Sequence, residues 1–338
     1  MHVVLSQAQG KHPVRRALEE SLVAALLVEP GIELAILPHL YDLDAEHPGR
    51  LHLGAVRTDM VILSWLYPRA AYWCLDRAGI KGQEGATLLV PAAEEDESDD
   101  GEKTEGPQGI GALDVPSDRY LYCIDLRNET KVDAFVEEIR RIAAESASRA
   151  ESKIAPVMVE LNLAPLKAAA AGEVELKTAP RFTPDQLLTQ PGRRWYPVID
   201  YSRCTNCMEC IDFCLFGVYG LDDQERILVE SQDACKKGCP ACSRVCPEHA
   251  IIFPEYKTPA IAGAPVGGIE SLKIDLTRLF GGGDAMKIAA QERDRELVAD
   301  GRDAVGMTIG IPKRQADKPA EPKDDLDKLM DSLDALDL

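Results

Sequence analysis

The sequence predicts an α/β domain with a mainly parallel sheet, followed by a small α+β domain and a flexible C-terminal tail. Strand and helix patterns alternate over residues 1–163, which is typical of a parallel sheet covered by helices. Eight of the ten cysteines lie between Cys204 and Cys246, which indicates a separate unit built around ligands. The chain from residue 312 onward is rich in charge and ends in a short segment with one apolar stripe.

Apolar runs in the first domain predict its strands. They lie at residues 3–5, 32–37, 60–63, 86–90 and 120–126, and the alternating residues Val157, Val159, Leu161 and Leu163 predict a last strand. Helices are predicted between these strands, beginning at Pro13, at Pro68 and near Lys131. The apolar face of the first helix is expected to comprise Val14, Ala17, Leu18, Leu22, Ala25 and Leu26.

Parallel sheets of this kind bind ligands beyond the carboxyl ends of their strands. The sequence has neither G-x-G-x-x-G nor G-x4-G-K-[ST], so no phosphate-binding loop is predicted. Residues 64–69 follow a strand and precede a helix, so their N–H groups and Arg69 could hold an anion; the alternative is ordinary packing with Arg69 in a surface ion pair. Cys74 and Cys123 lie in apolar surroundings and are expected to be inert core thiols.

Composition argues against several classes of partner. The chain has 38 Lys and Arg against 57 Asp and Glu, a net charge of −19, and only 5% aromatic residues, so nucleic-acid binding is not expected. The longest uncharged apolar run, residues 60–67, is far shorter than the roughly 20 residues that a membrane span needs. The N-terminus carries no secretion signal pattern. We therefore expect a cytoplasmic protein without a membrane span.

Four segments are expected to lie outside the packed cores of the two domains. Residues 91–118 are expected to form a disordered loop within the α/β domain, because the part from Pro91 to Pro107 contains eight acidic residues and one lysine. Residues 164–194 are expected to be a connector. An extension follows at 258–311, with a polar helix expected over 284–299. The flexible tail, 312–338, is expected to contain a short amphipathic helix from Lys323 that docks to a partner.

The spacing of the eight clustered cysteines indicates the metal. Cys204, Cys207, Cys210 and Cys214 are spaced C-x2-C-x2-C-x3-C, and Cys235, Cys239, Cys242 and Cys246 are spaced C-x3-C-x2-C-x3-C-P. Three closely spaced thiolates can wrap one corner of an iron–sulfur cubane, whose fourth iron must be reached by a cysteine from elsewhere. A structural zinc site favours two separated C-x2-C pairs. The pattern therefore favours [4Fe–4S] clusters over zinc.

The two cysteine runs form an internal repeat. Val198 precedes Cys204 by six residues, and Val229 precedes Cys235 by the same distance. Each half is predicted to be a strand, a cysteine loop, a short helix and a second strand. Two such halves would make a small α+β domain around two clusters.

Residues 195–257, with CTNCMECIDFC and CKKGCPACSRVCP, resemble bacterial-type ferredoxins with two [4Fe–4S] clusters. In that family the last cysteine of each run binds the other cluster. The resemblance therefore implies one cluster on Cys204, Cys207, Cys210 and Cys246, and another on Cys235, Cys239, Cys242 and Cys214. Two features depart from the family: Leu215 replaces the usual proline, and Cys235 and Cys239 are separated by three residues instead of two.

The resemblance implies an electron-transfer protein that relays single electrons to or from a redox protein or oxidoreductase complex, docked by the α/β domain and the tail. Two alternatives remain open. The chain could be an oxidoreductase subunit whose α/β domain holds a flavin or nucleotide, or an iron–sulfur regulatory or assembly protein. No catalytic residues are predicted, so the electron carrier without its own substrate site is favoured over an enzyme.

Overall fold

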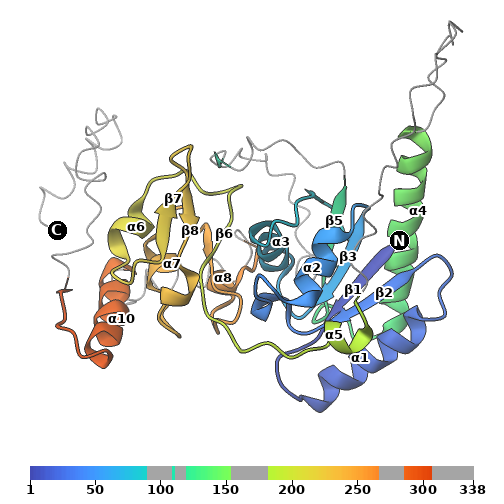
Figure 1. Ribbon diagram of the computed structural model, residues 1–338, viewed down its shortest axis with the longest axis horizontal. Coiled ribbons are helices and arrows are strands. Elements are labelled where there is room, and N and C mark those ends of the chain that lie inside the picture. Colours follow the sequence, from blue (N-terminus) through green and yellow to red (C-terminus); the bar gives the residue numbers. More distant parts are fainter. Residues whose placement is uncertain (90–108, 111–118, 154–181, 266–284, 307–338) are drawn as a thin grey trace, which may run out of the picture.

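The computed structural model describes residues 1–89, 109–110, 119–153, 182–265 and 285–306. The predicted strand over 157–163, nearly all of the acidic loop 91–118 and the tail 312–338 lie outside these residues. The described part contains an α/β domain with a five-stranded sheet, followed by small antiparallel sheets and helices (Figure 1).

The sheet of the α/β domain is parallel throughout, in the order β2-β1-β3-β5-β4. Its strands are β1 (His2–Ser6), β2 (Glu33–Leu37), β3 (Met60–Ser64), β4 (Gln83–Glu84) and β5 (Tyr120–Asp125). Its helices are α1 (Pro13–Leu26), η1 (Leu40–Asp42), α2 (Pro48–Ala55), α3 (Pro68–Arg77) and α4 (Val132–Lys153). The mainly parallel sheet predicted from the sequence is confirmed.

Both faces of the sheet are buried, and successive residues of each strand point to opposite cores. Val3, Leu5, Val61 and Leu63 pack in one core with α1 and α4, whereas Val4, Met60 and Ile62 pack in the other with α2 and α3. Every residue of β3 is buried, because this strand lies in the middle of the sheet. Burial on both faces explains why these strands are continuous apolar runs in the sequence.

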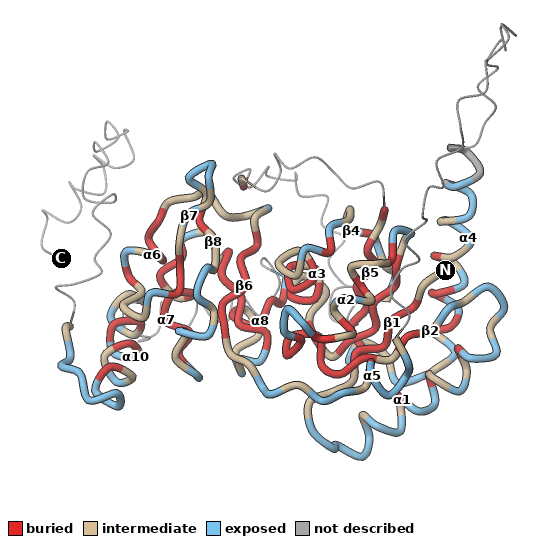
Figure 2. The backbone as a smooth tube through the Cα atoms, viewed as in Figure 1, coloured by how far each residue is buried: buried red, intermediate tan, exposed pale blue. Residues whose placement is uncertain are grey.

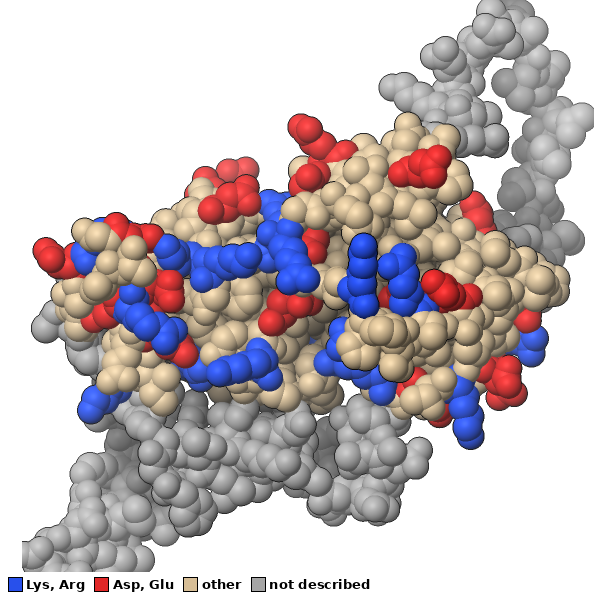
Figure 3. Space-filling model, turned by 90° about the horizontal axis from the view of Figure 1, so that it is seen from below, with Lys and Arg blue, Asp and Glu red and all other residues tan. Residues whose placement is uncertain are grey.

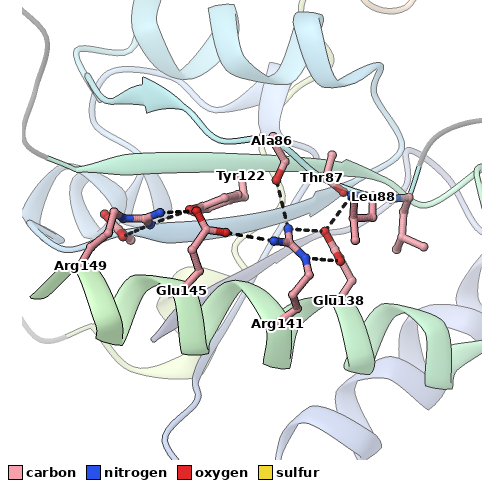
Figure 4. A network of polar contacts seen from close by, with 10 residues as sticks. Ala86, Thr87, Leu88, Tyr122, Glu138, Arg141, Glu145 and Arg149 are labelled. Atoms are coloured by element: carbon pink, nitrogen blue, oxygen red, sulfur yellow. Dashed lines mark hydrogen bonds and ion pairs between the residues drawn. The ribbon is translucent and has the colours of Figure 1, made fainter. Parts of the chain in front are cut away.

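The strand predicted at residues 86–90 is wrong for its described part, residues 86–89. Pairing with β5 ends at Gly85, where an added Cβ would lie 2.4 Å from the ring of Tyr122. Beyond it, side chains of α4 take the backbone hydrogen bonds, as Figure 4 shows: Glu138 accepts from the N–H of Leu88, and Arg141 donates to the carbonyl of Ala86. The segment is therefore bound to a helix rather than to a strand.

The predicted apolar face of α1 is correct only in its second half. Leu22 and Leu26 are buried and Leu18 is partly buried, but Val14 is 72% exposed and Ala17 is also exposed. The helix meets the sheet only from about Leu18 onward, so its first turn faces solvent.

The second part of the chain is built from short elements. They are α5 (Pro184–Leu187), β6 (Val198–Ile199), α6 (Glu209–Phe213), β7 (Tyr219–Leu221), β8 (Ile227–Val229), η3 (Gln232–Ala234), α7 (Ala241–Val245), β9 (Ile251–Ile252), α8 (Pro259–Ala262) and α10 (Ala285–Ala299). Strands β6 and β9 pair antiparallel, as do β7 and β8. The order strand, cysteine loop, short helix, strand occurs twice, as the repeat predicts.

The two parts share a continuous core. Val198 of β6 and Ile252 of β9 are fully buried in the same core as α2 and α3, and Figure 2 shows the buried segments of both parts facing one another. Tyr41 and Tyr196 stack with ring centroids 4.3 Å apart, and each hydrogen-bonds to the backbone of the other. This core fixes the cysteine loops relative to the α/β domain.

Among the helices of the described residues, none combines the length and apolarity that crossing a bilayer requires.

Candidate functional site

The eight clustered cysteines line two separate cavities. The first is lined by Cys204, Cys207, Cys210 and Cys246. The second is lined by Cys214, Cys235, Cys239 and Cys242. Each cavity thus receives three cysteines from one run and the last cysteine of the other. These are the same two groups that the family resemblance implies.

The first cysteine loop is shaped by two residues in the left-handed backbone region. Asn206 has φ 59° and Met208 has φ 65°, and α6 begins immediately after Met208. The side chain of Asn206 holds the loop against the β7–β8 hairpin, accepting from the N–H of Ile227 and donating to the carbonyl of Glu225. The left-handed turns let Cys204, Cys207 and Cys210 wrap one cavity.

The second loop contains the additional residue between Cys235 and Cys239. Gly238 has φ 87°, a conformation that glycine adopts without strain, and it directly precedes Cys239. The chain turns there and continues through Pro240 into α7, which carries Cys242. The longer spacing therefore still brings all three cysteines to the second cavity.

The last cysteine of each run ends the short helix of its half. Cys214 follows α6 with φ −77° and ψ 116°, and Cys246 follows α7 with φ −69° and ψ 114°. The backbone becomes extended at the same place in both halves, so each of these cysteines leaves its helix toward the other half's cavity. The helix ends thus place each of these two cysteines in the lining of the other half's cavity.

Burial dominates the electrostatics of these thiols. It raises the pKa of Cys204 and of Cys239 to about 11, and that of Cys210 and Cys242 well above the ordinary value. The second cause for Cys210 is the neighbouring thiols of the same cavity, which raise its pKa further because their thiolates would repel one another. Joint ionisation requires nearby positive charge, which a bound metal supplies.

The α/β domain forms part of the first cavity's surroundings. Arg69 at the start of α3 pairs with the buried Asp200 at 2.5 Å and donates to the carbonyl of His249 at 2.6 Å. The sequence offered two roles for Arg69, binding an anion or forming an ion pair at the surface. Both are wrong, because its partner Asp200 is buried where the two parts of the chain meet. The N–H groups of Gly109 and Ile110 donate to the carbonyls of Ser202 and Cys204.

Helix α10 supports the second cavity. Arg293, which lines that cavity, is 1% exposed and lies over the ring of Phe213 at 4.5 Å. Met286 and Ala289 of the same helix pack with Phe213 and Cys239. A local pattern pointed to Arg69, but not to its partner, and none pointed to Arg293. Asp200, two residues before Ser202, could have been found as a turn former, because it accepts the Ser202 N–H.

Cys74 and Cys123 do not join either group. Both are buried in the α/β domain, and burial raises the pKa of Cys74 to about 12 and that of Cys123 well above its usual value. They are core thiols, as predicted. Within the described ranges, no three His, Cys, Asp or Glu side chains are grouped closely enough to hold a single metal ion.

Comparison with known proteins adds one relationship. Part of this chain is similar to a ferredoxin. An uncharacterized ferredoxin of Methanocaldococcus jannaschii is 48% identical over 66 residues, which are 19% of this chain and 44% of that protein. The chain thus matches less than half the length of this curated relative. No family model matches the chain, and no solved structure matches it.

Proposed function

We propose that this protein is an electron carrier with two [4Fe–4S] clusters. Cys204, Cys207, Cys210 and Cys246 would hold one cluster, and Cys214, Cys235, Cys239 and Cys242 the other. The observation that carries the proposal is the pair of cavities, each lined by four cysteines drawn from both runs. The similarity to a ferredoxin supports the same conclusion.

The arrangement of the cysteines suits a cluster better than a zinc ion. A structural zinc site favours two separated C-x2-C pairs, whereas each of these cavities is lined by three closely spaced cysteines of one run and the last cysteine of the other. Bound clusters would accept and release single electrons with little movement of their ligands, at potentials set by burial, nearby charge and hydrogen bonds. The protein supplies the buried thiols and the aromatic shield, including Phe213, Tyr219 and Phe253.

A redox protein or oxidoreductase complex would be the partner, docked by the α/β domain and the tail. The described residues give some support for a charged docking surface. Figure 3 shows Lys and Arg side chains gathered across the middle of one face, over the junction of the two parts. Such a face favours an acidic surface on the partner.

The test is the metal content and spectrum of anaerobically purified full-length protein. We expect about eight irons and about eight acid-labile sulfides per chain, because each cluster of this type contains four of each. Dithionite should bleach the brown absorbance and produce electron paramagnetic resonance signals of reduced clusters, and the reduced protein should pass electrons to cytochrome c. Bound zinc without a visible chromophore would overturn the proposal.

A further inference from the structure

An open cleft lies between the end of α3 and the β7–β8 hairpin. It encloses about 390 Å³, and its lining includes Arg77, Lys81, Ile199, Tyr201 and Arg226. Pockets for small organic ligands commonly enclose about 300–1,000 Å³ and favour junctions between domains. In volume and position the cleft therefore fits a small-molecule site.

The charges of the cleft favour an anion. Lys81 pairs with Asp76 at 2.6 Å, and Arg226 pairs with Asp222 at 2.8 Å. Arg77 has no carboxylate partner among the described residues: its guanidinium lies over the ring of Tyr196 at 4.7 Å and donates one long hydrogen bond, 3.4 Å, to Val229. The Nε atom of Arg77 is buried without a hydrogen-bond partner in the described structure.

Burial lowers the pKa of Arg77, which shows that its charge is poorly solvated in this position. A guanidinium with a buried donor that has no partner among the described residues is a costly arrangement, and a nearby anion would offset part of that cost. A phosphate, with several acceptor oxygens, matches these donors well. The cleft therefore favours the binding of an anion near Arg77.

The apolar part of the lining borders the first cysteine cavity. Leu228 and Val229 of β8 lie beside Ile199 of β6 and the ring of Tyr201. Ile199 lines both the cleft and the cavity of Cys204, Cys207, Cys210 and Cys246. The cleft is thus adjacent to the site of the proposed cluster, which favours a ligand able to exchange single electrons.

We propose that this cleft binds a phosphorylated flavin, with its phosphate at Arg77 and Lys81 and its ring system against the wall of Ile199, Leu228 and Val229. Flavins exchange electrons one at a time, and the phosphate meets the charge of the cleft. The redox part of this inference rests on the proposed function, whereas binding itself can be tested separately.

Calorimetric titration of flavin mononucleotide into the anaerobically purified full-length protein tests the site. We expect one molecule bound per chain, competition by inorganic phosphate, and binding of riboflavin weaker by at least about tenfold, because riboflavin lacks the phosphate. Lys81→Gln should weaken binding of the mononucleotide about tenfold, and Asp76→Asn should strengthen it, because it frees Lys81. Lys131→Gln, an exposed lysine outside the cleft, serves as the matched control and should change nothing.

Arg77→Gln should abolish binding, and Lys81→Gln keeps the test decisive if the Arg77 variant does not fold. Equal affinities for the mononucleotide and riboflavin would overturn the proposal, because recognition would not involve the phosphate. Absence of binding by protein with its full iron content would overturn it as well and would leave the electron-carrier proposal intact. Protein with zinc in place of iron that still bound the mononucleotide would refute only the electron-carrier proposal.

Discussion

Arg69 and Asp200 form a buried ion pair that joins the α/β domain to the first cysteine loop. The Nε atom of Arg69 lies 2.5 Å from a carboxylate oxygen of Asp200, whose side chain is 2% exposed. Asp200 also accepts the N–H and hydroxyl of Ser202, and its carbonyl accepts the N–H of Cys204. Because Arg69 also binds the carbonyl of His249, one guanidinium holds both turns that bring Cys204 and Cys246 to the first cavity.

Arg69→Gln should therefore destabilise the protein and damage the first cluster selectively. Removing one partner of a buried pair leaves the other charge uncompensated, which lowers the free energy of unfolding by about 3–5 kcal/mol. Iron content should fall from about eight toward about four per chain. Thermal unfolding and iron analysis measure both effects. Arg203→Gln is the control, since Arg203 donates to the carbonyl of Glu248 and has no carboxylate partner in the part of the chain that the structure describes. Equal losses in both variants would refute a special role for Arg69.

The proposed exchange of ligands between the two halves predicts crossed effects of cysteine substitutions. Cys214→Ala should damage the cluster of Cys235, Cys239 and Cys242, because Cys214 lines their cavity, and should spare the other cluster. Cys246→Ala should do the reverse. Electron paramagnetic resonance of the reduced variants distinguishes the two clusters. Loss of the cluster of Cys204, Cys207 and Cys210 in the Cys214 variant would show that each run binds its own cluster.

Helix α10 should protect the second cluster from oxygen. Arg293→Ala removes a fully buried side chain from the wall of the second cavity and should open it to solvent. In air, the second cluster should then decay several-fold faster, until about half of the iron remains. Visible absorbance and residual iron follow this decay. Arg295→Ala, on the exposed side of the same helix, should decay like the unmodified protein, and the same rate in both variants would contradict the role of Arg293.

The contacts of Glu138 should make stability depend on pH. Burial opposes ionisation of Glu138, but hydrogen bonds from Arg141 and the N–H of Leu88 lower its pKa below the usual 4.5. Its contribution is therefore complete above pH 4.5 and is lost as the pH falls through the lower pKa of the folded state.

Glu138→Gln should lower the free energy of unfolding at pH 7 by about 1–2 kcal/mol. The difference in melting temperature from the unmodified protein should shrink at pH 4. Glu137→Gln, an exposed neighbour, should show no difference at either pH. A difference for Glu138→Gln that does not change with pH would show that the ionised form is not what stabilises the fold.

The role of the tail is predicted from the sequence alone, since residues 312–338 lie outside the described structure. From Lys323 onward, leucines and one methionine recur every three or four residues, and aspartates lie off that stripe. Deletion of residues 323–338 should leave the iron content and the melting temperature unchanged and should weaken association with the redox partner. A melting temperature lower by several degrees with unchanged partner affinity would show that the stripe belongs to the protein's own core.

Much of the fold could be predicted because it depends on local patterns. Buried strands at residues 3–5 and 60–63 are continuous apolar runs, the strand predicted at 120–126 is apolar except for Asp125, and Pro13 and Pro68 each occupy the first turn of a helix. The strand predicted at 86–90 failed because its hydrogen-bond partners are side chains of α4, some 50 residues later in the chain. An apolar run cannot show whether a strand or a helix will be its neighbour.

The sequence by itself determined the cysteines, their spacing and the likeness between the two halves, because metal ligation depends on residue type and short-range geometry. Only the tertiary structure decided what surrounds the two cavities: Arg69 and Asp200 at the first, Arg293 at the second, and the cleft behind Ile199. Arg69 and Asp200 are 131 residues apart, and Phe213 and Arg293 are 80 apart. Contacts across such separations follow from the packing of whole elements against each other, which no local sequence pattern encodes.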